Sequence, residues 1–199
     1  MDTPLAPLDP RASALVLIDL QAGIVARDTA PWAARDVVRR AAQLARTCRS
    51  AGALVVLVHV VAAPGQPDAL RVLSDEPPPP PAARTPGWFD IVPELGPEPG
   101  DVVIAKRQWG AFYGTDLDLQ LRRRHIDTIL LAGISTNIGV ESTARDAYER
   151  GYQQVFASDA MAASTEADHV QTVTRILPRI GRVRITDRIV AALGGSPSS

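Results

Sequence analysis

The amino-acid sequence predicts an α/β protein with a three-layer, doubly wound, Rossmann-like fold, in which helices cover both faces of a six-stranded, mostly parallel sheet. Two observations support this prediction. Short apolar runs alternate along the chain with helical patterns, the order expected of a parallel sheet with helices on both faces. The runs are also rich in Val, Ile and Leu throughout, as strands buried on both faces require.

Six apolar runs of strand length predict the sheet, and turn residues or helical patterns separate them. These runs are Ala14–Leu20, Leu54–Val61, Asp101–Ala105, Thr128–Ala132, Gln154–Ala157 and Arg182–Ile185.

Helical patterns occupy segments between the strands. In residues 31–50 apolar positions recur at helical spacing, and Gly52 ends the helix. A second helix begins at Thr115, with acidic residues in its first turn and arginines in its last, which suits the helix dipole. Further helices are predicted over 137–150 and 165–177.

The chain is expected to form a single domain over residues 1–199, with a core at about 11–193 and a flexible tail at 194–199. A proline-rich loop spans 62–100, and its row Pro77 to Pro81 predicts a stiff, extended surface segment. A plain connector is one interpretation, but a loop of this length is more often a lid or an oligomer contact. Trp88 and Phe89 are the loop residues expected to reach inward.

Composition favours a small-molecule partner in the cytoplasm. The net charge is −1 and both signs are interspersed, so neither nucleic acid nor a membrane surface is expected as a partner. One cysteine excludes an internal disulfide and a thiolate metal cluster. The segment Met1–Pro10 lacks the apolar stretch of a signal peptide, and the apolar runs are too short to span a membrane.

Two charged residues close predicted strands. Lys106 is the only lysine among 21 Lys and Arg residues, and it ends the third strand, where open α/β sheets bind ligands. Asp19 lies at the end of the first strand, and a buried carboxylate is costly unless it is paired. We therefore expect an Asp19–Lys106 pair, although a stray surface lysine and a capping aspartate would also fit the pattern.

The segment Gly133–Ala147 predicts a strand, a polar elbow and the start of a helix. The first turn of such a helix offers unpaired N–H groups to a carboxylate or an oxyanion. Gly139 has no Cβ, so a ligand can approach the backbone closely there. An ordinary turn capped by Thr136 or Asn137 is the alternative.

Together these residues resemble the isochorismatase-like hydrolase family. The matching motifs are Asp19-Leu20-Gln21, Lys106 with the stretch from Trp109 to Leu117, and Gly133–Ala147, in the family's order over nearly the whole chain. The stretch Gln108–Phe112 and the elbow Ser135–Gly139 look most like those of the YecD-type branch, which lacks the catalytic cysteine.

The resemblance implies the chemistry of the site. Amide-cleaving members use a triad of Asp, Lys and Cys; Asp19 and Lys106 match the first two, and Gly139 stands at the nucleophile position. Cys48 does not replace the missing thiol, because it lies on the apolar stripe of the first helix. The true isochorismatases also resemble this chain in having glycine there, and they cleave an enol ether by proton transfer and attack by water.

The resemblance also implies further features. A cis peptide bond is expected at Ile134–Ser135, and relatives assemble as homodimers or homotetramers. Catalytic roles are expected for Asp19, Lys106 and Gly139, with backbone N–H groups near Gly139 and Val140 binding the substrate's oxygen. The residues expected to bind substrate are Gln21, Trp88, Trp109, Phe112, Ser135, Thr136, Asn137 and Val140.

No metal or other cofactor is expected. The histidine partners of the nicotinamide-cleaving relatives are missing, and no glycine-rich phosphate fingerprint is present. His59 fits a hydrogen-bonded histidine at a strand end, whereas His125 and His169 look like residues on helix surfaces.

Three functions remain open on sequence alone. The first is a hydrolase of a small metabolite in which Asp19 acts as acid or base without a covalent intermediate. The second is an inactive family member that binds a small molecule. The third is a hydrolase that recruits Ser135 or Thr136 as its nucleophile.

Overall fold

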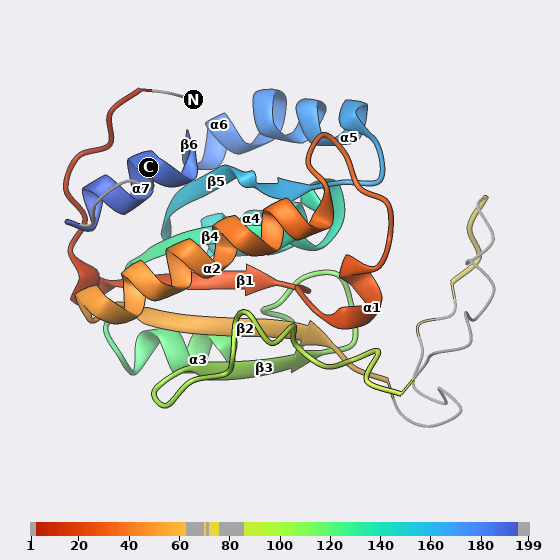
Figure 1. The fold of residues 1–199 in the computed structure, drawn as a ribbon, viewed down its shortest axis with the longest axis horizontal. Coiled ribbons are helices and arrows are strands. Elements are labelled where there is room, and N and C mark those ends of the chain that lie inside the picture. The colour runs from red at the N-terminus through yellow and green to blue at the C-terminus, as the bar shows by residue number, and fades with distance from the viewer. Residues whose placement is uncertain (1–2, 63–69, 71, 76–85, 195–199) are drawn as a thin grey trace.

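Six parallel strands form one sheet in the order β3-β2-β1-β4-β5-β6 (Figure 1). The structure is a computed structural model that describes residues 3–62, 70, 72–75 and 86–194. The strands are β1 (Ser13–Ile18), β2 (Leu54–Val60), β3 (Val102–Lys106), β4 (Thr128–Ile134), β5 (Gln153–Ala162) and β6 (Arg182–Arg184). The predicted α/β class is confirmed, and the sheet is parallel at every pairing rather than mostly parallel.

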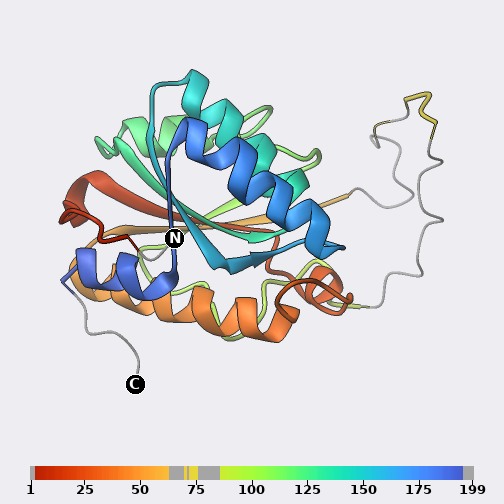
Figure 2. The same ribbon diagram turned by 90° about the horizontal axis from the view of Figure 1, so that it is seen from above.

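Helices cover both faces of the sheet, as predicted. Figure 2 shows α2 and α7 on one face and α3 to α6 on the other. The α-helices are α1 (Ala22–Val25), α2 (Ala34–Ala51), α3 (Leu117–Arg122), α4 (Glu141–Glu149), α5 (Glu166–Gln171), α6 (Leu177–Ile180) and α7 (Thr186–Ala192). A 3₁₀ turn, η1 (Pro10–Ala12), precedes β1, and two π-helical turns, η2 (Thr136–Val140) and η3 (Thr172–Ile176), precede α4 and α6.

Alternate residues of the inner strands β1, β2, β4 and β5 pack against different helix layers. Leu15 and Leu17 of β1 belong to the core under α2, whereas Val16 and Ile18 belong to the core under α3 and α4. Because successive side chains point to opposite faces, a strand covered on both sides needs apolar residues at every position. This double burial is why β1 and β4 appear in the sequence as unbroken apolar runs.

Two parts of the fold differ from the sequence prediction. β5 extends to Ala162 rather than Ala157, because Ser158 and Asp159 interrupt the apolar run without ending the strand. Asp159 is satisfied there by the backbone N–H and the hydroxyl of Thr186. The helix α7, which begins at Thr186, was not predicted at all, and the helix predicted over 165–177 divides into α5, η3 and α6.

Other predicted features lie partly outside the described residues. The row Pro77–Pro81 and the tail after Gly194 are among the residues that the structure does not describe.

The predicted end of α2 is confirmed, since Gly52 has a left-handed φ of 82° that glycine adopts without strain. Among the described residues, no helix combines the length and apolarity needed to cross a bilayer.

Candidate active site

The expected pair of charges forms at the carboxyl edge of the sheet. Asp19 follows β1 and Lys106 ends β3, with β2 between them. Lys106 Nζ lies 2.9 Å from Asp19 Oδ2. The lysine is 1 % exposed and the aspartate 7 %, so the ion pair is almost completely withdrawn from water.

The backbone around the pair holds both groups in place. The N–H group of Asp19 donates to the carbonyl of Val58 on β2, and Asp19 has a positive φ of 56°, which aspartate tolerates better than most residues. Lys106 Nζ also donates to the carbonyl of Trp109 at 2.5 Å. The loop after β3 therefore positions the ammonium group through a main-chain oxygen.

Burial makes Asp19 an unusual acid. It raises the pKa of the carboxyl from 3.8 to about 6, although the nearby Lys106 charge and, to a smaller extent, His59 lower it. Oδ2 is bound to Lys106, whereas Oδ1 is buried and has no hydrogen-bond partner among the described residues. A buried oxygen without a partner is costly, and burial favours the neutral, protonated form of the carboxyl.

Gly139 completes the group of three expected catalytic residues. A Cβ built on this glycine would lie 3.2 Å from both Asp19 Oδ2 and Lys106 Nζ, and 2.9 Å from Ile18 Cγ2. The backbone of the elbow therefore approaches the ion pair as closely as packing allows. The structure brings together three residues that are far apart in the sequence.

The elbow contains the expected cis peptide bond between Ile134 and Ser135. The carbonyl of Ser135 accepts hydrogen bonds from the N–H groups of Ile138 and Val140, at 3.2 and 3.1 Å. The N–H of Val140, which we expected to bind substrate, is thus already engaged within the elbow. The hydroxyl of Ser135 donates to Asn137 Oδ1 at 2.8 Å, so these two side chains bind each other.

Thr136 and His169 form a buried contact that the sequence did not predict. Thr136 Oγ1 lies 2.9 Å from His169 Nδ1, and both residues are buried. The prediction that His169 lies on a helix surface is wrong, and burial lowers the pKa of its imidazole. The available signal was its spacing from Thr172 and Val173, which share its buried face. Next to it, the charged Asp168 and the exposed Val170 obscured that signal.

Gln21 positions a neighbouring segment. Its side chain is fully buried; Oε1 accepts from the N–H of Val60 at 2.7 Å, and Nε2 donates to the carbonyls of Val60 and Trp88. The Trp88 indole lies so close to Gly23 that a Cβ there would overlap it. Gln21 therefore holds the end of β2 and the Trp88 segment beside Asp19.

The expected aromatic lining is only partly realised in this chain. Trp88 and Phe89 are partly buried and pack edge to face beside α1, and His59 Nδ1 is 3.0 Å from the Phe89 carbonyl. Phe112 is 4 % exposed and belongs to the core under α3 and α4, whereas the Trp109 side chain is 67 % exposed. Trp109 therefore contacts the ion pair through its main-chain carbonyl and not through its indole ring.

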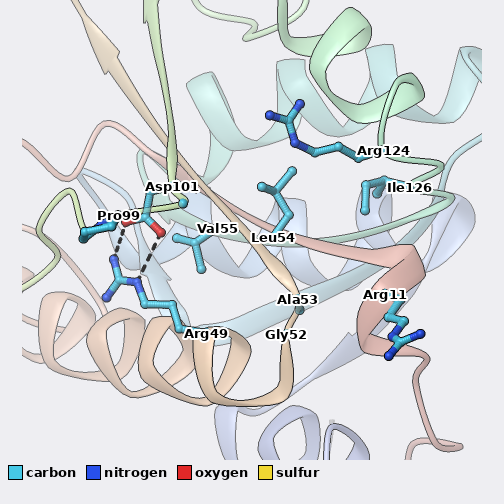
Figure 3. Close-up of a pocket in the computed structure, with 11 residues that line it drawn as sticks. Arg11, Arg49, Gly52, Ala53, Leu54, Val55, Pro99, Asp101, Arg124 and Ile126 are labelled. Atoms are coloured by element: carbon cyan, nitrogen blue, oxygen red, sulfur yellow. Dashed lines mark hydrogen bonds and ion pairs between the residues drawn. The ribbon is translucent and has the colours of Figure 1, made fainter.

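A separate cavity of about 330 Å³ lies at the opposite edge of the sheet (Figure 3). Leu54 at the start of β2 and Asp101 just before β3 line it, so it opens at the amino ends of the strands. Arg49 and Asp101 on its wall bind each other at 2.6 Å. The cavity is distinct from the group around Asp19.

The fold and this group define a class of protein. The site combines a parallel α/β sheet, an Asp–Lys ion pair and an elbow with a cis peptide bond. When the chain is compared with known protein families, the isochorismatase domain matches residues 13–188. The chain belongs to the isochorismatase family.

Individual relatives support this assignment. The isochorismatase family protein YecD of Escherichia coli O157:H7 is 48 % identical over 94 % of this chain and 98 % of its own length. An isochorismatase family protein of Burkholderia thailandensis has a solved structure that superposes with a TM-score of 0.90, at 46 % identity, over 95 % of this chain and 98 % of the other. The ureidoacrylate amidohydrolase RutB of Methylorubrum extorquens is 34 % identical over 76 % of this chain and 70 % of its own length.

Proposed function

We propose that this protein hydrolyses a small metabolite by acid–base catalysis at Asp19, without a covalent intermediate. The observation that carries the proposal is the geometry of Asp19, in which Lys106 Nζ holds Oδ2 at 2.9 Å and the buried Oδ1 has no hydrogen-bond partner among the described residues. Burial raises the pKa of this carboxyl to about 6. A group whose pKa lies near the working pH can both donate and accept a proton, as a general acid–base catalyst must.

The proton balance follows from this geometry. Protonated Asp19 gives its proton to the substrate at the bond that breaks, and Lys106 stabilises the carboxylate that remains. A water molecule attacks the substrate and its proton returns to Asp19. Backbone N–H groups of the elbow other than those of Ile138 and Val140 bind the oxygen on which negative charge develops. The bond is an enol ether or a C–N bond, since both are cleaved by water with this proton movement.

The absence of a thiol beside Lys106 favours a non-covalent route. We assign the chain to the YecD-type branch in which glycine occupies the nucleophile position, because Gly139 adjoins the ion pair where a side chain would face both charges. Cys48 is fully buried, and burial raises its pKa to about 12, which suppresses the reactive thiolate. The relative RutB, named as an amidohydrolase, makes C–N bonds the first substrates to test.

The alternative nucleophiles are less suited to the task. Thr136 and His169 have the spacing of a nucleophile and its base, but Thr136 is completely buried, whereas Asp19 keeps 7 % of its surface exposed. The Ser135 hydroxyl donates to Asn137. We infer that both side chains hold the elbow in shape. A binding protein without activity is the remaining alternative, and a homodimer or homotetramer remains our expectation.

A panel of small amides and enol ethers tests the proposal. The wild-type protein should hydrolyse at least one of them, and Asp19→Asn should lose that activity while keeping its circular dichroism spectrum. Intact-mass spectrometry during turnover should show no adduct on the protein. Activity in Asp19→Asn, or an acyl adduct on Ser135 or Thr136, would contradict the mechanism.

A further inference from the structure

Thr143 joins the two segments that surround the ion pair. It lies in α4 and is completely buried. Its hydroxyl donates to the carbonyl of Gly139 at 2.7 Å and accepts from the N–H of Ala111 at 3.1 Å. One hydroxyl therefore links the elbow to the loop after β3, and both of its hydrogen bonds are buried.

These two bonds close a ring of contacts around the ion pair. Lys106 Nζ is bound to the carbonyl of Trp109, two residues before Ala111 in the same loop. Gly139, at the other end of the Thr143 bridge, is the residue whose backbone adjoins Lys106 Nζ and Asp19 Oδ2. The ring thus runs from Lys106 through the loop to Thr143, on to Gly139, and back to the ion pair.

We propose that Thr143 is a positioning residue that fixes Lys106 against Asp19 by locking the loop after β3 to the elbow. The inference deepens the proposed function, because it concerns the same acid–base group. Thr143 touches neither charge and is not itself a catalytic residue. It acts through Ala111 and Gly139, and among the described residues its side chain is the one that hydrogen-bonds to both.

An ordinary helical threonine would not form this bridge. Threonine hydroxyls in helices often donate to the carbonyl four residues earlier, and the bond to Gly139 alone would be of that kind. The bond from Ala111 is different, since it comes from another segment, 32 residues away in the chain. Ala111 is itself fully buried, so its N–H group has no water to replace the hydroxyl.

The test measures the pKa of Asp19 and needs no substrate. The Asp19 carboxyl carbon is followed by NMR in labelled protein as a function of pH, with Asp19→Asn used to assign the signal. Thr143→Val keeps the shape of the side chain and removes the hydroxyl. We expect the pKa to rise by at least about half a unit, because Lys106 moves away from Oδ2 when the Trp109 carbonyl is released.

Two variants act as controls, and a third is held in reserve. Thr143→Ser keeps the hydroxyl and should restore the wild-type pKa. Thr186→Val removes another buried hydroxyl, which donates to Asp159 at 2.8 Å, and should leave the Asp19 pKa unchanged while lowering the melting temperature. If Thr143→Val does not fold, Thr143→Ala replaces it, since alanine is the residue best tolerated in a helix.

The outcomes separate the bridge from general stability. An unchanged Asp19 pKa in a folded Thr143→Val or Thr143→Ala variant would overturn the proposal. So would a fall toward 3.8, because that result means entry of water rather than release of Lys106. A shift in Thr143→Ser as large as in Thr143→Val would show that the hydroxyl is not responsible. The proposed hydrolysis could fail in its own assay without changing any of these results.

Discussion

Replacing Lys106 by methionine should raise the pKa of Asp19 further. In the wild-type protein burial raises this pKa to about 6 while the ammonium 2.9 Å from Oδ2 lowers it. An opposite charge at this distance lowers a carboxyl pKa by about 1–3 units. Without it the pKa should move from about 6 to about 7–9, so that Asp19 is largely protonated at neutral pH. Methionine fills most of the space of the lysine chain and limits collapse of the site.

The same substitution should change how stability depends on pH. A carboxyl whose pKa is higher in the folded than in the unfolded state stabilises the fold while protonated, so stability falls as pH rises between the two values. In the wild-type protein this fall runs from about pH 4 to about pH 6. In Lys106→Met it should continue to about pH 7–9. Each added unit corresponds to about 1.4 kcal/mol of the free energy of unfolding.

Two measurements check this prediction. NMR titration of the Asp19 carboxyl gives the pKa directly, and urea denaturation between pH 4 and pH 9 gives the stability profile. Arg123→Met removes a charge from an exposed residue after α3 and should leave both unchanged. An Asp19 pKa in Lys106→Met that stays at about 6 or falls would refute the electrostatic account of the site.

Three further substitutions follow from the structure. Asp101→Ala removes a carboxylate that Arg49 holds at 2.6 Å and should lower the free energy of unfolding by about 2 kcal/mol in urea denaturation; a loss below about 0.5 kcal/mol would show that this partly buried pair contributes little. Gly139→Cys places a thiol beside the Lys106 ammonium, which should lower the pKa of the new thiol. Iodoacetamide should then label the cysteine at position 139 while the buried Cys48 stays unmodified. No labelling at position 139 would show that the thiol does not reach the charge. Gln21→Leu removes the acceptor of the Val60 N–H group, so hydrogen exchange at Val60 should accelerate relative to wild type, and an unchanged exchange rate would show that another group replaces the amide.

The ion pair at the carboxyl ends of the strands could be predicted from the sequence. The pattern places Asp19 and Lys106 at the carboxyl ends of buried strands, and parallel strands bring such ends to one edge of the sheet. The cost of burying either charge alone then predicts their pairing. The structure shows this ion pair, with Gly139 against it as the family resemblance implied.

Contacts that depend on the path of a loop could not be predicted. The sequence singles out Trp109 as an aromatic residue, but its main-chain carbonyl is the group that reaches Lys106, and no residue pattern encodes a carbonyl contact. The Thr143 bridge requires Ala111 to approach α4, which only the folded loop reveals. Likewise, the sequence around His169 does not reveal that its side chain contacts Thr136 of the elbow, where it is buried.

The most direct test of hydrolysis at Asp19 is untargeted mass spectrometry of a bacterial metabolite extract incubated with the wild-type protein and, in parallel, with Asp19→Asn. The account predicts that at least one compound is consumed by the wild type alone and that its products differ from it by the addition of water. Their masses would distinguish cleavage of an enol ether from that of a C–N bond. Identical extracts after both incubations, or equal consumption by both proteins, would contradict the proposal that Asp19 catalyses hydrolysis.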